Sequence, residues 1–412
     1  MNAHQWAAEQ PARRRKAGWL GVFAAFFHKA LDRIDAGLAS GSIELSLPDG
    51  SQRLLGGRAP GPAARVDVAS WRALIRLANG GSAGWYVAWA EREWSSPDPV
   101  VLFDLFMRNR LTLGDAGRSR GLGRRIRQAI NRGHRNSRAG ARRNIAAHYD
   151  LGNDFYGLWL DPTLSYSSAL FAAPGESLET AQRRKLAAIL ERTATAPGDE
   201  ILEIGCGWGS FVEIAAQAGR RVHAITLSAE QQHAVVARCD RLDLAGVRVS
   251  LTDYRDVTGR YDAIASIEMV EAVGQAYWPD YLAAIARALK PGGRAAIQYI
   301  AIDDAIFDRY ARNVDFIQRF VFPGGMLLSE SRFRALAEQH GLDWQDQRRF
   351  GADYAETLRR WRMAFEEAIE RGAVPGKFTP EFINLWRFYL MYCEGGFRGG
   401  GIDVAQVTLV KR

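Results

Sequence analysis

The stretch Glu200-Ile-Leu-Glu-Ile-Gly-Cys-Gly-Trp-Gly209 decides the fold. Its short apolar run predicts a buried strand that ends in a tight, glycine-rich turn. Gly205, Gly207 and Gly209 let the backbone turn sharply and approach a ligand, because no Cβ atom stands in the way. The GxGxG spacing lacks the last interval of the dinucleotide-binding pattern GxGxxG. Taken alone, the stretch fits a ligand-binding turn and a plain strand-to-helix turn equally well.

The residues that follow alternate between strand-like and helix-like patterns. A second apolar strand is expected at 222–228, after which Ser228 and Gln231 have the spacing of a helix capping box. A third strand would end at Asp253, and a fourth is expected at 261–267. This alternation predicts a doubly wound α/β sheet, in which ligands bind where the strands end.

Three regions are expected along the chain. Residues 1–112 contain short apolar runs separated by the turn signals 48–50 and 60–62, which indicates a small α+β domain. Residues 113–143 hold ten arginines and a single acidic residue, as a linker or basic helix would. This region is interpreted as a solvated linker, a membrane tether or a nucleic-acid arm, and charge alone does not decide. Residues 144–412 form the α/β domain.

The composition limits the class of protein. The net charge of +8 favours an anionic partner. Cys206, Cys239 and Cys393 have no metal-ligand spacing, so no metal is expected and a reducing cytoplasm fits. No apolar run approaches the roughly 20 residues that span a bilayer. Large apolar residues recur at helical spacing in 19–34, which predicts a packed or membrane-lying helix rather than a cleaved signal peptide.

The glycine turn and the strand order resemble class I S-adenosylmethionine-dependent methyltransferases. Upstream, Ala147-His-Tyr-Asp-Leu-Gly-Asn-Asp-Phe-Tyr156 and Leu160-Asp-Pro-Thr-Leu-Ser-Tyr-Ser-Ser168 narrow the resemblance to the cyclopropane-fatty-acyl-phospholipid synthase family. The other matching motifs are Gly205-Cys-Gly-Trp-Gly209, Thr226-Leu-Ser-Ala-Glu-Gln231, Asp253-Tyr-Arg-Asp256, residues 317–325 and Tyr392-Cys-Glu-Gly-Gly-Phe397. The resemblance implies a mostly parallel, seven-stranded Rossmann-like sheet, a smaller lipid-facing α+β domain, and S-adenosylmethionine as cofactor.

The resemblance also implies the cofactor contacts. It places the glycine turn against the methionine part of the cofactor, and Asp253 and Tyr254 beside the adenine. Thr226 and Gln231 stand where many such enzymes carry an acidic residue for the ribose. The full expected set is Tyr149, Tyr166, Ser167, Gly205, Cys206, Gly207, Gly209, Thr226, Leu227, Ser228, Gln231, Asp253 and Tyr254.

Methylation of an alkene needs a base. Attack on the sulfonium methyl leaves a carbocation in the chain, which must be stabilised and then deprotonated. The family uses bicarbonate as that base, and the resemblance implies that Ser168, Glu271, Gln298 and Tyr354, with the backbone of Ile300, would hold it.

Three residues depart from the family pattern at this place. Ser168 replaces the usual Cys, Gln298 the usual His, and Glu268 the usual Gly. A carboxylate added beside an anion site would repel bicarbonate and could itself serve as the base. We therefore expect Glu268 to replace the ion, with a simple pairing to an arginine as the alternative. If the segment is helical, Glu268 and Glu271 share one face.

Cys393 matches a cysteine that is often marked as catalytic in the family. Alkene methylation needs no thiolate, so a small buried apolar role is the alternative.

The expected substrates are unsaturated phospholipid acyl chains at an anionic membrane surface, with the protein peripheral to the inner face of the cytoplasmic membrane. The product is a cyclopropane or, with Glu268 as base, a methyl-branched or methylene chain. Homo-oligomerisation stays open. A nucleic-acid methyltransferase is disfavoured, because residues 268–274 replace the Asn/Asp-Pro-Pro-aromatic motif. A non-catalytic lipid-binding protein on a methyltransferase fold is the rival from another class.

Overall fold

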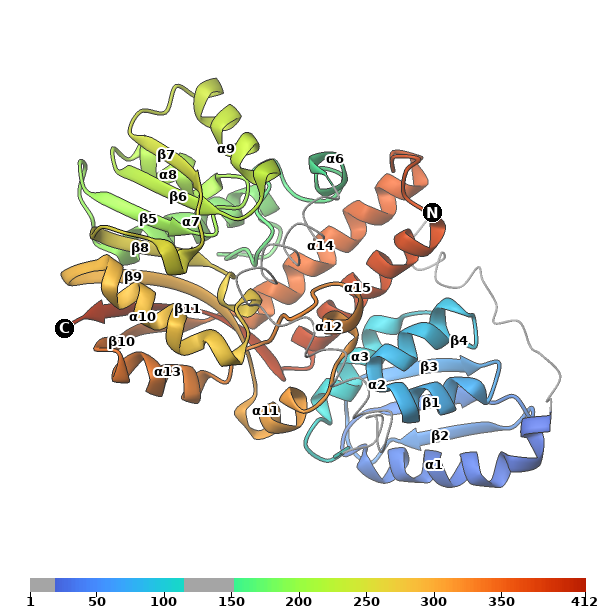
Figure 1. The fold of residues 1–412 in the computed structure, drawn as a ribbon. Coiled ribbons are helices and arrows are strands. Elements are labelled where there is room, and N and C mark those ends of the chain that lie inside the picture. The colour runs from blue at the N-terminus through green and yellow to red at the C-terminus, as the bar shows by residue number, and fades with distance from the viewer. Residues whose placement is uncertain (1–18, 115–151) are drawn as a thin grey trace. The chain divides into compact units, whose positions relative to one another are not determined.

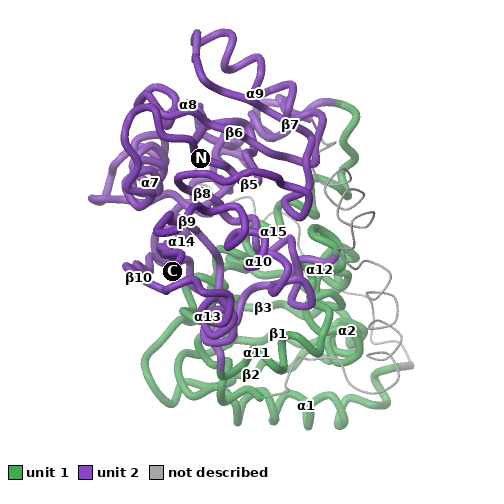
Figure 2. Tube along the Cα trace, turned by 60° about the vertical axis from the view of Figure 1, so that its left-hand side comes forward, with its two compact units in different colours: residues 1–133, 305–323, 376–402 green, residues 134–304, 324–375, 403–412 purple. Residues whose placement is uncertain are grey.

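The computed structural model describes residues 19–114 and 152–412. Most of the Arg-rich region, and Tyr149, lie outside these residues. The chain forms two compact units (Figure 2). Unit 1 comprises residues 1–133, 305–323 and 376–402, and unit 2 comprises the rest. The domain division expected from the sequence stays a prediction, but packing groups the chain differently, because two late segments belong with the N-terminal part.

Unit 1 is the smaller α+β part (Figure 1). Its sheet has the strand order β2-β1-β3-β4, with β1 parallel to β3 and antiparallel to β2. The turn expected at 48–50 connects β1 to β2. The strands are β1 (Ser42–Ser46), β2 (Gln52–Gly56), β3 (Ala63–Val68) and β4 (Trp94–Ser95). The helices are η1 (Trp19–Phe23), α1 (Ala24–Gly37), α2 (Arg72–Ala90), α3 (Pro99–Arg108), α11 (Asp304–Ala311), α12 (Phe316–Phe320) and α15 (Pro380–Arg398).

The late helix α15 packs on α3 within unit 1. Two glycines make this close approach feasible. A Cβ atom on Gly395 would lie 2.4 Å from Phe103 Cβ, and one on Gly399 would lie 2.5 Å from Met107 Cβ. The Tyr392–Phe397 motif therefore has a packing role in unit 1, independent of chemistry.

The predicted N-terminal helix forms as η1 and α1. On α1, Phe27 and Leu31 are buried, and Phe27 stacks on Trp71 with 4.8 Å between ring centroids. Nearby Val22 and Phe26 are 86% and 68% exposed. One face of the segment therefore packs into unit 1 while other apolar side chains face solvent. Among the described helices, none is long and apolar enough to cross a membrane.

Unit 2 contains the seven-stranded sheet that the sequence predicts. Its order is β10-β11-β9-β8-β5-β6-β7, parallel from β9 to β7, while β10 and β11 are antiparallel. The strands are β5 (Glu200–Ile204), β6 (Arg221–Thr226), β7 (Val247–Leu251), β8 (Tyr261–Ile267), β9 (Leu289–Ile302), β10 (Leu342–Arg349) and β11 (Ile402–Lys411).

Helices accompany this sheet, as expected for a doubly wound fold. They are α6 (Asn153–Tyr156), α7 (Leu178–Thr193), α8 (Ser210–Gln217), α9 (Ala229–Arg241), α10 (Trp278–Ala288), α13 (Glu330–Gln339) and α14 (Gly351–Glu370), with short 3₁₀ turns η2 (Tyr254–Asp256), η3 (Val270–Ala272) and η4 (Gln275–Tyr277). The chain runs from β5 outward through β6 to β7 and then returns to β8 on the other side of β5. The carboxyl ends of β5 and β8 thus meet at a switch point, where such sheets bind ligands.

Candidate active site

The glycine turn after β5 opens onto a pocket. Gly205, Gly207 and Gly209 have φ values of 83°, 52° and 85°, a region that favours glycine. A Cβ atom on Gly207 would meet nothing within 4 Å, so this backbone borders open space. Gly209 instead caps the N-terminus of α8.

Most of the expected cofactor residues line this one pocket. They are Tyr166, Ser167, Gly205, Cys206, Gly207, Thr226, Leu227, Gln231, Asp253 and Tyr254. Gly209 and Ser228 do not line the pocket. Each caps the N-terminus of a helix, and the Ser228 hydroxyl accepts a hydrogen bond from the Gln231 amide at 3.2 Å. The structure thus brings ten expected residues together, while the role of each one stays a prediction.

Two polar pairs shape the pocket wall. The Thr226 hydroxyl donates to Gln231 Oε1 at 2.7 Å, and the Ser228 amide donates to the Thr226 hydroxyl at 3.1 Å. The Asp253 carboxylate accepts from Arg255 Nε at 2.8 Å and Nη2 at 2.6 Å. Because Arg255 donates to both carboxylate oxygens, the Asp253 side chain helps to hold the turn η2 that follows it.

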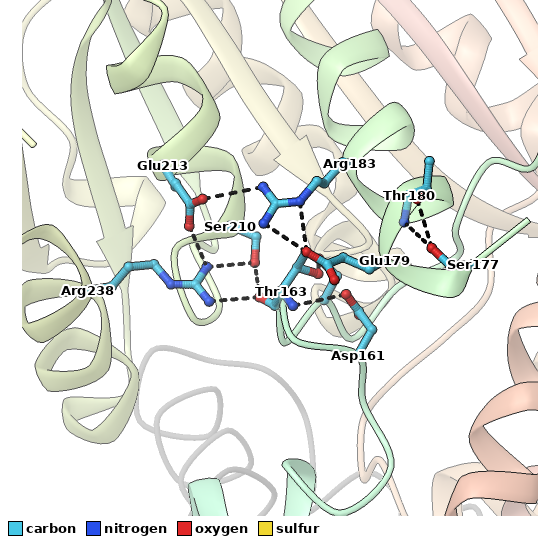
Figure 3. A network of polar contacts seen from close by, with 10 residues as sticks. Asp161, Thr163, Ser177, Glu179, Thr180, Arg183, Ser210, Glu213 and Arg238 are labelled. Atoms are coloured by element: carbon cyan, nitrogen blue, oxygen red, sulfur yellow. Dashed lines mark hydrogen bonds and ion pairs between the residues drawn. The ribbon is translucent and has the colours of Figure 1, made fainter. Parts of the chain in front are cut away.

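A polar network anchors the loop 161–168, which carries several expected site residues (Figure 3). Arg238 is buried and donates to the Ser210 hydroxyl at 3.1 Å and to the Thr163 carbonyl at 3.0 Å. Ser210 also donates to the Thr163 carbonyl. Glu213 lies 3.6 Å from Arg238 and balances its charge. Helices α8 and α9 therefore fix the loop beside the glycine turn that begins α8.

Glu268 is the centre of the expected catalytic group. Its carboxylate accepts three hydrogen bonds of 2.8 Å, from the Ser168 amide, Gln298 Nε2 and the Tyr354 hydroxyl. Glu268 also lines the pocket. None of these partners is an arginine, so the described residues do not support the simple arginine pairing. Three donors aimed at one carboxylate favour its charged form.

The backbone at Glu268 is not helical. Glu268 and Glu271 therefore do not share a helix face, which was expected only for a helical segment. Its φ is 49°, in the left-handed region, and its amide donates to the Gln298 carbonyl at 2.8 Å. Burial raises the pKa of the Glu268 carboxyl above its ordinary value, and its three hydrogen bonds and the Lys185 ammonium partly counter this rise.

Glu271 follows on the short turn η3. Its Oε1 accepts a hydrogen bond from the Ile300 amide, while its buried Oε2 has no partner among the described residues. Burial, and then the charge of Glu268, raise the pKa of Glu271 to about 8. At neutral pH the Glu271 carboxyl is therefore mostly protonated.

Sequence reasoning missed three buried polar residues of this region. Glu203 lines the pocket, and its Oε2 has no partner among the described residues. Lys185 also lines the pocket, and Gln406 Nε2 donates to Gln298 Oε1 at 3.0 Å. Glu203 was recognisable as an acid inside an apolar strand, and Lys185 as a lysine at the spacing of buried Ala181 and Ile189.

Burial also raises the pKa of Glu203 well above its ordinary value. A cationic ligand beside this carboxyl would favour its charged form. An orphaned carboxyl oxygen, an open glycine turn and a second acid at Glu268 therefore fit a cofactor that carries positive charge, such as the ammonium and sulfonium groups of S-adenosylmethionine.

Cys393 lies on α15 in unit 1, whereas the other expected catalytic residues belong to unit 2. Burial, together with the nearby Asp315, raises the pKa of the Cys393 thiol. The residue is therefore a neutral thiol at physiological pH, as expected for a packing role. Its catalytic assignment stays a prediction.

Comparison with known proteins agrees with this geometry. Residues 136–407 match the family described as mycolic acid cyclopropane synthetase. The tuberculostearic acid methyltransferase UfaA1 of Mycobacterium tuberculosis is 42% identical over 287 residues, which are 67% of this chain and 66% of that protein. The cyclopropane-fatty-acyl-phospholipid synthase of Escherichia coli K12 is 36% identical over 265 residues, 63% of this chain and 66% of that protein. The chain thus spans just under two thirds of the length of both relatives.

A solved structure shows the same fold with a cofactor product bound. The mycolic acid cyclopropane synthase CmaA1, complexed with SAH and CTAB, aligns at a TM-score of 0.62 and 30% identity, over 66% of this chain and 98% of that chain. The sequence-based predictions of family, sheet and cofactor are confirmed. The chain belongs to the mycolic acid cyclopropane synthetase family, and its seven-stranded unit has the fold and cofactor class of S-adenosylmethionine-dependent methyltransferases.

Proposed function

We propose that the protein transfers the methyl group of S-adenosylmethionine to the double bond of an unsaturated phospholipid acyl chain, with Glu268 as the base. The observation that carries this proposal is that Glu268 lines the pocket and that three donors hold its carboxylate. The cofactor supplies an electrophilic methyl group. The glycine turn and Glu203 would hold it, since they border the same pocket.

The donors expected to hold bicarbonate already have partners. Ser168, Gln298 and Tyr354 donate to Glu268, and the Ile300 amide donates to Glu271. An added anion would lose these hydrogen bonds and would also face the charge of Glu268. A protein carboxylate in the place of the ion therefore accounts for Glu268 and for its partner Gln298, whereas the Ser168 hydroxyl donates to the Ala169 carbonyl.

The proposed reaction balances as follows. A new carbon–carbon bond forms between the methyl group and one alkene carbon, and the carbon–sulfur bond breaks, with its electron pair kept by sulfur. The cation on the other alkene carbon is stabilised by the adjacent Glu268 carboxylate. Glu268 then takes a proton from a neighbouring chain carbon, and the released pair forms a double bond.

This proposal favours a methyl-branched chain that keeps one double bond over a cyclopropane. A carboxylate fixed by three hydrogen bonds samples fewer positions than a free ion, so it is aimed at a limited set of protons. The relative UfaA1, whose name denotes a methyltransferase, is 42% identical, and the cyclopropane synthase of Escherichia coli is 36% identical. Both reactions share every step before deprotonation, so the position of the base decides between them.

The test uses the full chain, vesicles of unsaturated phospholipid and S-adenosylmethionine labelled on the methyl carbon, in bicarbonate-depleted buffer. Wild type should label the acyl chains, with one added carbon by mass spectrometry and no cyclopropane ring protons by NMR, since the two possible products have the same mass. Glu268→Gln should bind cofactor and lose a factor of about 10² to 10⁴ in turnover.

The matched control is Glu200→Gln, which changes an acid at the opposite end of β5, and it should retain activity. A cyclopropane product with full activity in Glu268→Gln would exclude Glu268 as the base. A protein that binds cofactor and lipid without transferring label to the lipid would support the non-catalytic lipid-binding alternative.

The membrane surface is the proposed place of action, at the inner face of the cytoplasmic membrane. Val22, Phe23 and Phe26 expose apolar side chains on η1 and α1, and the chain carries a net charge of +8. Such a segment would insert its apolar side chains while basic residues contact anionic headgroups.

Vesicle sedimentation tests the membrane proposal. Binding to anionic vesicles should weaken as salt rises, and Phe26→Ser should weaken it further. The control Leu54→Ser changes an exposed apolar residue on β2 and should bind as wild type does. Equal binding to neutral and anionic vesicles would contradict the role of charge.

A further inference from the structure

Helix α7 carries a lysine on its buried face. Lys185 is 1% exposed, and its ammonium donates to the Ser167 hydroxyl at 2.6 Å. Among the described residues this hydroxyl is its only hydrogen-bond acceptor. An ammonium group with a single neutral partner is poorly compensated for its lost hydration, and an apolar residue would serve the packing of α7 better. The cost of burying Lys185 therefore calls for an explanation beyond packing.

Three carboxyl groups act on the Lys185 ammonium through their negative charge. They belong to Glu268 after β8, Asp161 in the anchored loop and Glu203 on β5, in decreasing order of effect. In the described residues, none of them lies within ion-pair distance of Lys185. Burial lowers the pKa of Lys185 and these carboxyl groups counter it, giving about 8. Glu268 also faces the Glu271 carboxyl, which is mostly protonated at neutral pH.

Lys185 is connected to Glu268 along two routes. Its side chain holds the Ser167 hydroxyl, and the next residue, Ser168, donates its amide to Glu268. Its carbonyl accepts from Gln406 Nε2 at 3.3 Å, and Gln406 donates to Gln298, which in turn donates to Glu268. Both routes end at the same carboxylate, although Lys185 precedes it by more than eighty residues in the sequence.

We propose that Lys185 is a positioning residue for Glu268, which fixes the Ser167–Ser168 peptide against the carboxylate and supplies the positive charge that this carboxylate faces. The inference rests on the proposed function of Glu268 as the base. An acyl chain that enters the pocket displaces water and lowers the local dielectric constant, which strengthens the effect of a fixed charge. Lys185 touches neither the chain nor its reacting carbons in this role.

The test is the pH dependence of turnover in Lys185→Met. Without the ammonium, Glu268 is harder to ionise, so the acidic limb of the kcat profile should move to higher pH by about one unit. At pH values below the limb kcat should fall about ten-fold, and it should recover towards wild type as pH rises. A purely structural defect would lower activity at every pH and leave the limb in place.

Two further variants complete the design. Lys185→Gln keeps a donor for Ser167 without the charge, so it should shift the limb as Lys185→Met does, and it replaces that variant if Lys185→Met does not fold. Lys290→Met removes a surface lysine that pairs with Asp262 and should leave the profile unchanged. An unshifted limb in a folded Lys185 variant overturns the inference.

Glu268→Gln is measured in the same series. If it retains full turnover, the proposed base is wrong whatever Lys185 does. If it is inactive while the limb of the Lys185 variants is unshifted, only the role of Lys185 is wrong.

Discussion

The turns after β5 and β8 lie at adjacent strand ends of the same sheet, yet they serve the site in opposite ways. After β5, glycines with positive φ leave space, and a Cβ atom on Gly207 would point into open volume. After β8, Glu268 also has positive φ, but it carries a long side chain that is held by three donors. The left-handed conformation costs a non-glycine residue about 1–2 kcal/mol. The turn after β5 leaves space for a ligand. The turn after β8 adopts a strained conformation that holds the Glu268 carboxylate in place.

The largest expected effect lies in the first turn. Gly207→Val would place a branched side chain where the pocket is open, and valine is strained at a φ of 52°. Cofactor binding should be lost, as measured by calorimetry on a variant whose folding is verified by circular dichroism. Gly292→Val, at an open position of positive φ outside the pocket, is the control. Unchanged affinity in folded Gly207→Val would remove the cofactor site from this turn.

The second turn allows the opposite change. Glu268→Gly introduces the residue that the family usually has and frees the donors of Ser168, Gln298 and Tyr354. Turnover should fall by a factor of about 10² to 10⁴, as for loss of a general base. Added bicarbonate should restore part of it, because the freed donors can hold an anion. Wild type should not respond to bicarbonate, and a wild type that does respond would contradict the proposed replacement.

A smaller effect is expected from removing one of the three hydrogen-bond donors that hold Glu268, here called the clamp. Tyr354→Phe removes one hydrogen bond to Glu268. A hydrogen bond to a charged group contributes about 1.5–3 kcal/mol, so turnover should fall at least about ten-fold. The acidic limb of kcat should also shift upward, since the ionised carboxylate loses a donor. Tyr310→Phe, on α11 of unit 1, provides a control for loss of a tyrosine hydroxyl, and equal effects of the two changes would argue against the clamp.

The smallest effect concerns stability. The pKa of Glu271 is about 8 in the folded protein, above the ordinary value near 4.3 expected for the unfolded chain. Such a group stabilises the fold fully below the unfolded value and progressively less as pH rises through the folded value. As pH rises from 5 to 8, the thermal stability of Glu271→Gln should therefore increase relative to that of wild type. Melting temperatures measured across this range would show a constant difference if Glu271 were ionised throughout.

The sequence by itself determined the backbone of the site. Apolar strands followed by glycines or caps are local patterns, so the parallel strand succession and the residues at the strand ends could be predicted. These residues include Thr226 and Asp253, which do line the pocket. Tyr166, in the loop 161–168, also lines it, but the family resemblance predicted it. The departures at Ser168, Gln298 and Glu268 were also visible, because each stands inside a recognisable motif.

Only the tertiary structure decided which side chains meet. Glu268 and Ser168 are separated by 100 positions, Glu268 and Tyr354 by 86, and Gln406 and Lys185 by 221. Likewise, no local pattern places α15 with the N-terminal unit, since that depends on how Gly395 and Gly399 fit α3. Local patterns specify the backbone and the buried face of an element. The charge state of a buried group depends instead on neighbours that packing supplies from distant parts of the chain.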